Sequence, residues 1–200
     1  MSNAIRNYLA AYNFIAFVFW TLYLVWFIAS GLEFSDTALS LLCVAQGLAV
    51  LEILHVLLKW VKSPVLSTIA QVMSRLLVVF VILAIRLFPH ENFSNPAVLN
   101  VGIIIVSFAW SITEIIRYSF YFLSLFNKQP KWLLWMRYSF FIALYPLGVT
   151  GEWLIIISPI VVAKNYFSLY SAFVIMLFAA YAYYFPVLYK YMWKQRKLKL

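Results

Sequence analysis

Tyr145 and Glu152 lie seven residues apart in the apolar stretch ALYPLGVTGEW. In an α-helix, this spacing places the two side chains within about 20° of each other around the axis and about 10.5 Å apart along it. A phenol and a carboxyl group on one helix face can divide an acid–base reaction, one accepting a proton and the other donating one. The alternative is that Tyr145 is simply one of 14 tyrosines and that Glu152 reaches toward the nearest polar interface.

The residues between Tyr145 and Glu152 favour a shared site. Pro146 removes a backbone hydrogen bond and bends a helix, and Gly148 and Gly151 allow another group to approach the backbone closely. An axial separation of about 10.5 Å is large for two groups that act on neighbouring atoms. We therefore expect the segment 146–151 to be distorted, or the two side chains to tilt toward each other.

Other ionisable residues also interrupt apolar stretches of the chain. Glu114 and Arg117 are three residues apart and are neighbours on one helix face, which predicts an ion pair and is compatible with a role facing a substrate. Arg75 has no acid at a suitable spacing in its own stretch. We expect its partner to come from elsewhere in the fold, and the candidates are Glu52, Glu114 and Glu152.

Glu52 and His55 form the short string E-x-x-H. The same string supplies metal ligands in di-iron helix bundles, but there it occurs twice and is joined by two further glutamates. Here it occurs once, and the single cysteine, Cys43, lies in an apolar stretch. We interpret Glu52 and His55 as a polar structural pair, and we predict no metal site.

The composition identifies the environment of these residues. Of 200 residues, 66% are hydrophobic and only 10% are charged, whereas about a quarter of the residues of a soluble domain are charged. Only six residues are acids. The chain is therefore an integral membrane protein, which excludes a water-soluble enzyme and argues against nucleic-acid binding despite the net charge of +9.

Six stretches are long and apolar enough to cross a bilayer, which takes about 20 residues in a helix. Their apolar runs do not alternate as barrel strands do, so we predict an all-α bundle of six transmembrane helices in one domain, residues 1–200. Basic residues concentrate on alternate connections and in the tail, so both termini are predicted to be cytoplasmic. The predicted spans are roughly 12–31, 38–58, 67–88, 98–126, 132–157 and 166–190.

Several blocks of the sequence, taken together, resemble one family. They are LEILH (51–55), SPVLSTIAQVMSRLLVV (63–79), AWSITEIIRYSFY (109–121), RYSFFIALYPLGVTGE (137–152) and the basic ending FPVLYKYMWKQRKLKL (185–200). In this order they resemble the membrane 3-hydroxyacyl-CoA dehydratases, once described as protein-tyrosine-phosphatase-like proteins. The family signature Y-P-x-G-x-x-x-E falls on residues 145–152, and the resemblance covers roughly 40–200.

The resemblance implies a lyase of the fatty-acid elongation cycle. Such an enzyme removes water from a (3R)-3-hydroxyacyl-CoA to give the trans-2-enoyl-CoA, without a redox cofactor or a metal. The catalytic residues of the family fall on Tyr145 and Glu152. Its supporting positions fall on Arg75, Glu114, Arg137 and Gly148, and Arg117 joins them here as the neighbour of Glu114.

The chemistry fits these residue types. Dehydration needs one group to take a proton from C2, which the thioester acidifies, and another to protonate the departing C3 hydroxyl. Tyr145 and Glu152 can fill these two roles in either order. The acyl chain would lie between helices or open toward lipid. Four lysines on two predicted cytoplasmic connections are placed to meet the CoA phosphates, although the positive-inside rule alone would also put lysines there: Lys59, Lys62, Lys128 and Lys131.

Two other functions are compatible with a small membrane bundle. A transporter could use the buried Glu, Arg and Tyr residues as a relay, but the sequence has no convincing internal repeat. A non-catalytic scaffold could bind other elongation enzymes, such as the condensing enzyme and the reductases, which are also expected partners of a dehydratase. The expected location is the endoplasmic reticulum membrane in a eukaryote and the inner membrane in a bacterium.

Overall fold

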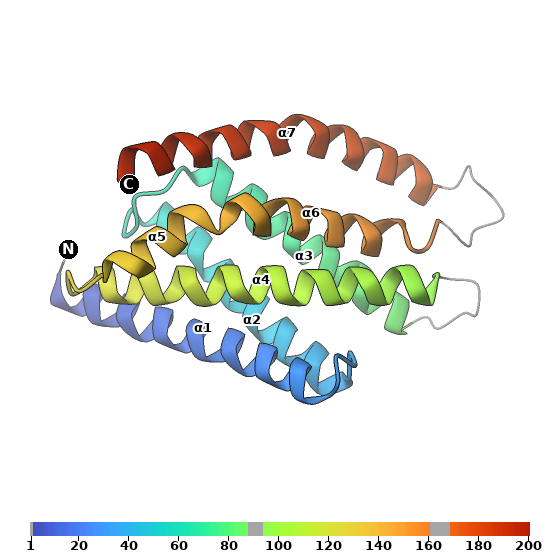
Figure 1. Cartoon of the computed structure of the whole chain (residues 1–200), viewed down its shortest axis with the longest axis horizontal. Helices are drawn as coiled ribbons and strands as arrows, with labels where there is room; N and C mark the ends of the chain where they lie inside the picture. The colour runs from blue at the N-terminus through green and yellow to red at the C-terminus, as the bar shows by residue number, and fades with distance from the viewer. Residues whose placement is uncertain (1, 88–93, 161–168) are drawn as a thin grey trace.

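The computed structural model describes residues 2–87, 94–160 and 169–200, and in these ranges the chain forms seven helices and no strand (Figure 1). The all-helical class predicted from the sequence is confirmed. The helices are α1 (Asn3–Ala29), α2 (Asp36–Leu57), α3 (Val65–Leu87), α4 (Pro96–Ser124), α5 (Lys131–Ser139), α6 (Phe141–Ile157) and α7 (Leu169–Lys199).

The long helices run back and forth along the length of the bundle, and the two ends of the chain lie at the same end of it (Figure 1). Five helices, α1, α2, α3, α4 and α7, are long and apolar enough to cross a membrane. Helices α5 and α6 pass the same test only as a pair, with a bend of 43° between them. Counting this pair as one span would give six, so the six-span arrangement and the cytoplasmic side of the termini remain predictions.

Helix starts follow from local capping. The hydroxyl of Ser35 accepts a hydrogen bond from the amide of Ala38 at the start of α2, and the side chain of Asn95 accepts from Ala97 and Val98 at the start of α4. Pro96 occupies the first turn of α4, where its missing N–H costs nothing. Such caps stabilise a helix by about 1 kcal/mol each, so the sequence itself sets where these two spans begin.

The centre of the bundle is built from aromatic side chains of α1 that pack toward α4. Trp20, Tyr23 and Phe27 are almost completely buried, and the hydroxyl of Tyr23 lies 2.6 Å from that of Ser107 on α4. Large apolar side chains on the outer surface are exposed instead, among them Phe80 (66%) and Ile175 (70%). Exposed apolar residues of this size suit a surface that faces lipid rather than water.

Helices α4 and α6 lie in close contact at two glycines. A Cβ atom added to Gly151 would lie 2.8 Å from a side-chain carbon of Val106 and 3.0 Å from the carbonyl oxygen of Gly102. A Cβ added to Gly102 would meet the backbone of α6 equally closely. Small residues at a helix crossing allow the backbones of membrane helices to touch, so this contact sets the distance between α4 and the helix that carries Tyr145 and Glu152.

The bend between α5 and α6 lies earlier than the sequence predicted. Residues 146–151 are regular helix within α6, and the break falls at Phe140, so the expected distortion of this segment is not observed. Proline bends a helix on its N-terminal side because its ring displaces the carbonyl of the residue four positions earlier. For Pro146 that residue is Ile142, and its carbonyl oxygen accepts a hydrogen bond of 3.3 Å from the hydroxyl of Tyr189 on α7.

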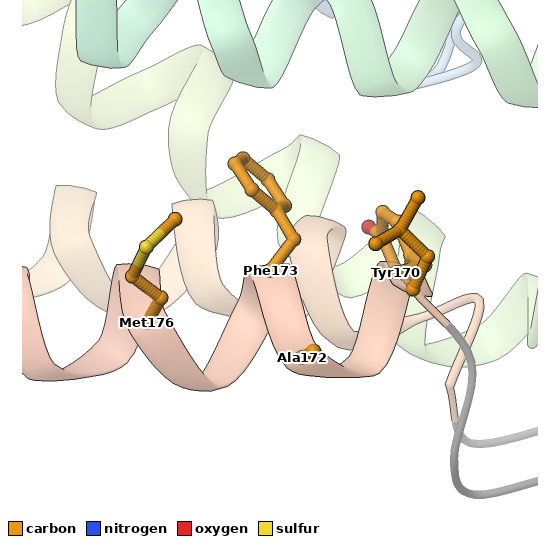
Figure 2. Close-up of a pocket in the computed structure, with 5 residues that line it drawn as sticks. Tyr170, Ala172, Phe173 and Met176 are labelled. Atoms are coloured by element: carbon orange, nitrogen blue, oxygen red, sulfur yellow. The ribbon is translucent and has the colours of Figure 1, made fainter.

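Helix α7 contacts α6 through tyrosine hydroxyls as well as through stacked aromatic rings. Tyr189 donates to the carbonyl oxygen of Ile142, and Tyr170 donates to that of Ile156, at 2.6 Å. The outer side of α7 is exposed, and near its start an open apolar pocket of about 770 Å³ is lined by Leu169, Tyr170, Ala172, Phe173 and Met176 (Figure 2). Neither Tyr145 nor Glu152 lines this pocket.

The glycine contact between α4 and α6 leads to a stability prediction. Replacing Gly151 with alanine should lower the free energy of unfolding by about 1–3 kcal/mol, because the new methyl group overlaps Val106 and Ile105. Thermal unfolding in detergent measures the change. Gly47→Ala is the control, since a Cβ there meets no atom within 4 Å, and equal stability of the two variants would contradict the prediction.

Candidate active site

Glu152 is buried in the interior of the bundle with a donor on each carboxyl oxygen. Its side chain comes from α6 and is 7% exposed. Oε1 accepts a hydrogen bond of 3.0 Å from the indole Nε1 of Trp110 on α4. Oε2 accepts one of 2.8 Å from the hydroxyl of Tyr181 on α7. Three helices therefore meet at this carboxyl group.

The other two acids within the spans are held in ion pairs. Arg117 binds Glu52 through both of its terminal nitrogens, at 2.9 and 2.5 Å, and also lies 2.6 Å from Glu114. Glu114 forms a second ion pair with Arg75. The predicted pair of Glu114 and Arg117 is therefore confirmed, and Glu114 is the partner of Arg75 among the three candidates.

Glu152 differs from Glu52 and Glu114 in the kind of partner it has. In the described part of the chain, each of those two acids has an arginine within ion-pair distance, whereas the hydrogen bonds to Glu152 come from neutral groups. The charges of Glu52, Glu114, Arg75 and Arg117 balance among themselves. The arrangement leaves Glu152 free to gain or lose a proton without breaking an ion pair.

The ion-pair network nevertheless ends beside Glu152. The guanidinium of Arg75 lies over the ring of Trp110, with Cζ 5.4 Å from the ring centroid, and Trp110 donates to Glu152. Gly148 lies against the same tryptophan, since a Cβ there would be 3.9 Å from its Nε1. Arg75, Glu114 and Gly148, which the family resemblance picked out, are thus gathered around Trp110.

Tyr145 is half-buried and packs against α7. Its ring stacks on Phe185, with centroids 4.9 Å apart and planes within 2°, and more loosely on Tyr189, at 6.1 Å. Tyr145 and Glu152 both contact side chains of α7, so the structure places them on one side of α6.

The remaining predicted residues lie elsewhere. Arg137 on α5 donates to the hydroxyl of Tyr121 at 3.2 Å and lies over its ring, on the side of the site nearer the chain ends. His55 lies 3.0 Å from the hydroxyl of Tyr8, and Glu52 accepts hydrogen bonds from Arg117, so the reading of Glu52 and His55 as a polar structural pair stays a prediction. All four lysines are exposed, at the end of the bundle that also holds the termini (Figure 1). Lys59, Lys62 and Lys128 lie on the connections before α3 and α5, and Lys131 is the first residue of α5.

Sequence reasoning missed the two residues that contact Glu152. Trp110 had a detectable signal, because it lies four residues before Glu114 and therefore on the same face of its helix. Tyr181 had none: it is one of several tyrosines in YAYYF, and nothing in that string distinguishes it. Its place opposite Glu152 depends on how α7 packs against α6.

The fold and the site together define a class of protein. It is an integral membrane helix bundle in which a buried acid, held by neutral donors, and a tyrosine lie on one side of α6. Such a site is suited to proton transfer on a substrate that reaches into the bundle.

Comparison with known proteins identifies the family. Residues 46–200 match the family described as protein tyrosine phosphatase-like protein, PTPLA. The chain is 35% identical to the very-long-chain (3R)-3-hydroxyacyl-CoA dehydratase hpo-8 of Caenorhabditis elegans, over 97% of this chain and 94% of the relative. It is 43% identical to very-long-chain (3R)-3-hydroxyacyl-CoA dehydratase 2 of Mus musculus, over 74% of this chain and 61% of the relative.

A plant relative is similar to the same degree. The dehydratase PASTICCINO 2B of Oryza sativa subsp. japonica is 42% identical over 74% of this chain and 66% of its own length. No solved structure matches the chain. The chain belongs to the protein tyrosine phosphatase-like family, whose similar members are named as dehydratases.

The ion-pair network yields a second stability prediction. Glu114→Gln should lower the free energy of unfolding by about 3–5 kcal/mol, because it leaves the largely enclosed Arg75 without its carboxylate partner and Arg117 with Glu52 alone. The control is Asp36→Asn, which breaks the exposed pair of Asp36 and Arg86 and should cost less than about 1 kcal/mol. Chemical unfolding in detergent measures both variants, and equal losses would contradict the prediction.

Proposed function

We propose that this chain removes water from a (3R)-3-hydroxyacyl-CoA to form the trans-2-enoyl-CoA, with Tyr145 and Glu152 as the acid–base pair. Membership of a family whose relatives are named as very-long-chain (3R)-3-hydroxyacyl-CoA dehydratases supports the reaction. The assignment of the two residues rests on the burial of Glu152 and on the kind of donors that hold its carboxyl group. Among the acids of the described helices, Glu152 is the one held by neutral donors without an arginine, and it lies on the same side of α6 as Tyr145.

The reaction needs two proton transfers that balance. One residue takes the proton from C2, the electron pair of that C–H bond forms the C2–C3 double bond, and the C3–O bond breaks. The other residue gives its proton to the departing hydroxyl, which leaves as water. After product release, proton exchange between Tyr145 and Glu152, or with water, restores the starting state. The chemistry uses side chains that the site already contains.

The position of the pair suits a substrate with a polar head and an apolar tail. Tyr145 follows Lys131 by 14 residues, which is about 20 Å of helix rise. A pantetheine arm can cover such a distance from a CoA head that stays at the end of the bundle carrying the lysines. The acyl tail would then continue among the apolar side chains of the spans, where its burial is favourable.

The same substrate suggests where the protein works. In elongation, the hydroxyacyl-CoA is the product of one reductase and the enoyl-CoA is the substrate of another, and both are amphipathic. We propose that the chain acts in the membrane that holds the condensing enzyme and these reductases, which is the endoplasmic reticulum if the source is eukaryotic and the inner membrane if it is bacterial. The several long apolar helices agree with a multi-pass membrane protein.

Substitution of the acid–base pair tests the function. Tyr145→Phe and Glu152→Gln should each lower kcat for enoyl-CoA formation by about 10²–10⁴, because each removes one general acid or base. Purified protein in detergent and a defined 3-hydroxyacyl-CoA are sufficient for the assay. Tyr183→Phe, on the exposed side of α7, is the matched control and should behave as the unsubstituted protein. Full activity of either site variant would refute the assignment.

A separate experiment tests the lysines at the end of the bundle. Changing Lys59, Lys62, Lys128 and Lys131 to alanine together should raise KM for the CoA substrate about tenfold and leave kcat unchanged, since exposed charges act on phosphate binding and not on the reaction. The corresponding pantetheine thioester lacks the nucleotide phosphates and should show no such difference. An unchanged KM for the CoA substrate would count against this contact.

A further inference from the structure

Helix α7 presents three aromatic side chains to the site at a spacing of four residues. Tyr181 donates to Glu152, while Phe185 and Tyr189 stack with Tyr145. Residues four apart lie on one helix face. One face of α7 therefore contacts both members of the proposed acid–base pair, although α7 lies outside the segment that carries their signature.

We propose that Tyr181 is a positioning residue that orients Glu152 for proton transfer. This inference rests on the proposed function, because it assigns Tyr181 a part in the reaction of that same site. Tyr181 is on α7, whereas Glu152 is on α6, so the hydrogen bond between them also connects the two helices at the proposed active site.

The two donors to Glu152 are not equivalent. Trp110 belongs to α4, is 3% exposed and is packed into the core of the bundle. An indole N–H can only donate, so Trp110 holds Oε1 in place without exchanging a proton. A phenolic hydroxyl both donates and accepts, so Tyr181 can keep its hydrogen bond whether Glu152 carries a proton or not. Tyr181 is therefore the partner that can either donate to Glu152 or accept from it, in both the protonated and the deprotonated form of the carboxyl group.

Removal of the Tyr181 hydroxyl should change the reaction more than the fold. Loss of one hydrogen bond to a group that becomes charged predicts a fall in kcat of about 10- to 100-fold for Tyr181→Phe. KM for the hydroxyacyl-CoA should change little, because Tyr181 acts on Glu152 and not on the CoA head. The pH profile of kcat should also move, since the partner of the titrating carboxyl group has been removed.

Tyr170→Phe is the matched control for this experiment. It removes a hydroxyl from the same helix, and that hydroxyl also donates to α6, but to the backbone carbonyl of Ile156 rather than to Glu152. The two variants should lose similar stability. Only Tyr181→Phe should show the fall in kcat and the displaced pH profile.

The outcomes separate this inference from the proposed function. If the unsubstituted protein does not dehydrate hydroxyacyl-CoA, the proposed function itself fails. If it does, and Tyr181→Phe matches Tyr170→Phe in kcat and in pH profile, the role of Tyr181 is wrong. Should Tyr181→Phe not fold, 3-fluorotyrosine placed at position 181 keeps the ring and the hydroxyl but alters its acidity. A displaced pH profile of kcat then supports the role, and an unchanged one overturns it.

Discussion

Charge in the apolar interior of a membrane protein has to be balanced by partners within the bundle, and Glu114 is the centre of that balance here. It is 1% exposed, and it lies between Arg75 of α3 and Arg117 of its own helix. Arg117 extends the network to Glu52 on α2. Removing one partner would leave a buried charge uncompensated, so α2, α3 and α4 are held in one arrangement by this network.

The chemistry of the site depends on this balance. Because Glu52 and Glu114 use both arginines, Glu152 is left with Trp110 and Tyr181 as donors. A carboxyl group held by neutral donors can change its protonation state at a lower cost than one locked in an ion pair. The network thus separates structural acids from a reactive one among side chains of the same type, and it ends at Trp110, where Arg75 lies over the ring.

The placement of Pro146 shows how well local sequence predicts a helical membrane fold and where it fails. The positions of most spans agree with the observed helices to within a turn or two at their ends, but the distortion expected at residues 146–151 is not observed. The bend lies at Phe140 instead, earlier in the chain than Ile142, whose carbonyl the proline ring displaces. The hydrogen bond from Tyr189 to Ile142, which satisfies the freed carbonyl, could not be predicted, since it depends on how α7 packs.

The sequence by itself determined that this is a membrane bundle, which family it resembles, and that Tyr145 and Glu152 share one helix face, because composition, motif order and helical period are properties of the chain alone. Helical spacing already predicted the pair of Glu114 and Arg117, but only the tertiary structure decided the ion pairs that join different helices. Arg75 had three candidate acids, and the packing of α3 against the other helices selected Glu114. The same holds for Trp110 and Tyr181, whose contacts with Glu152 join residues far apart in the sequence. Such contacts depend on the crossing of helices, and no local pattern encodes them.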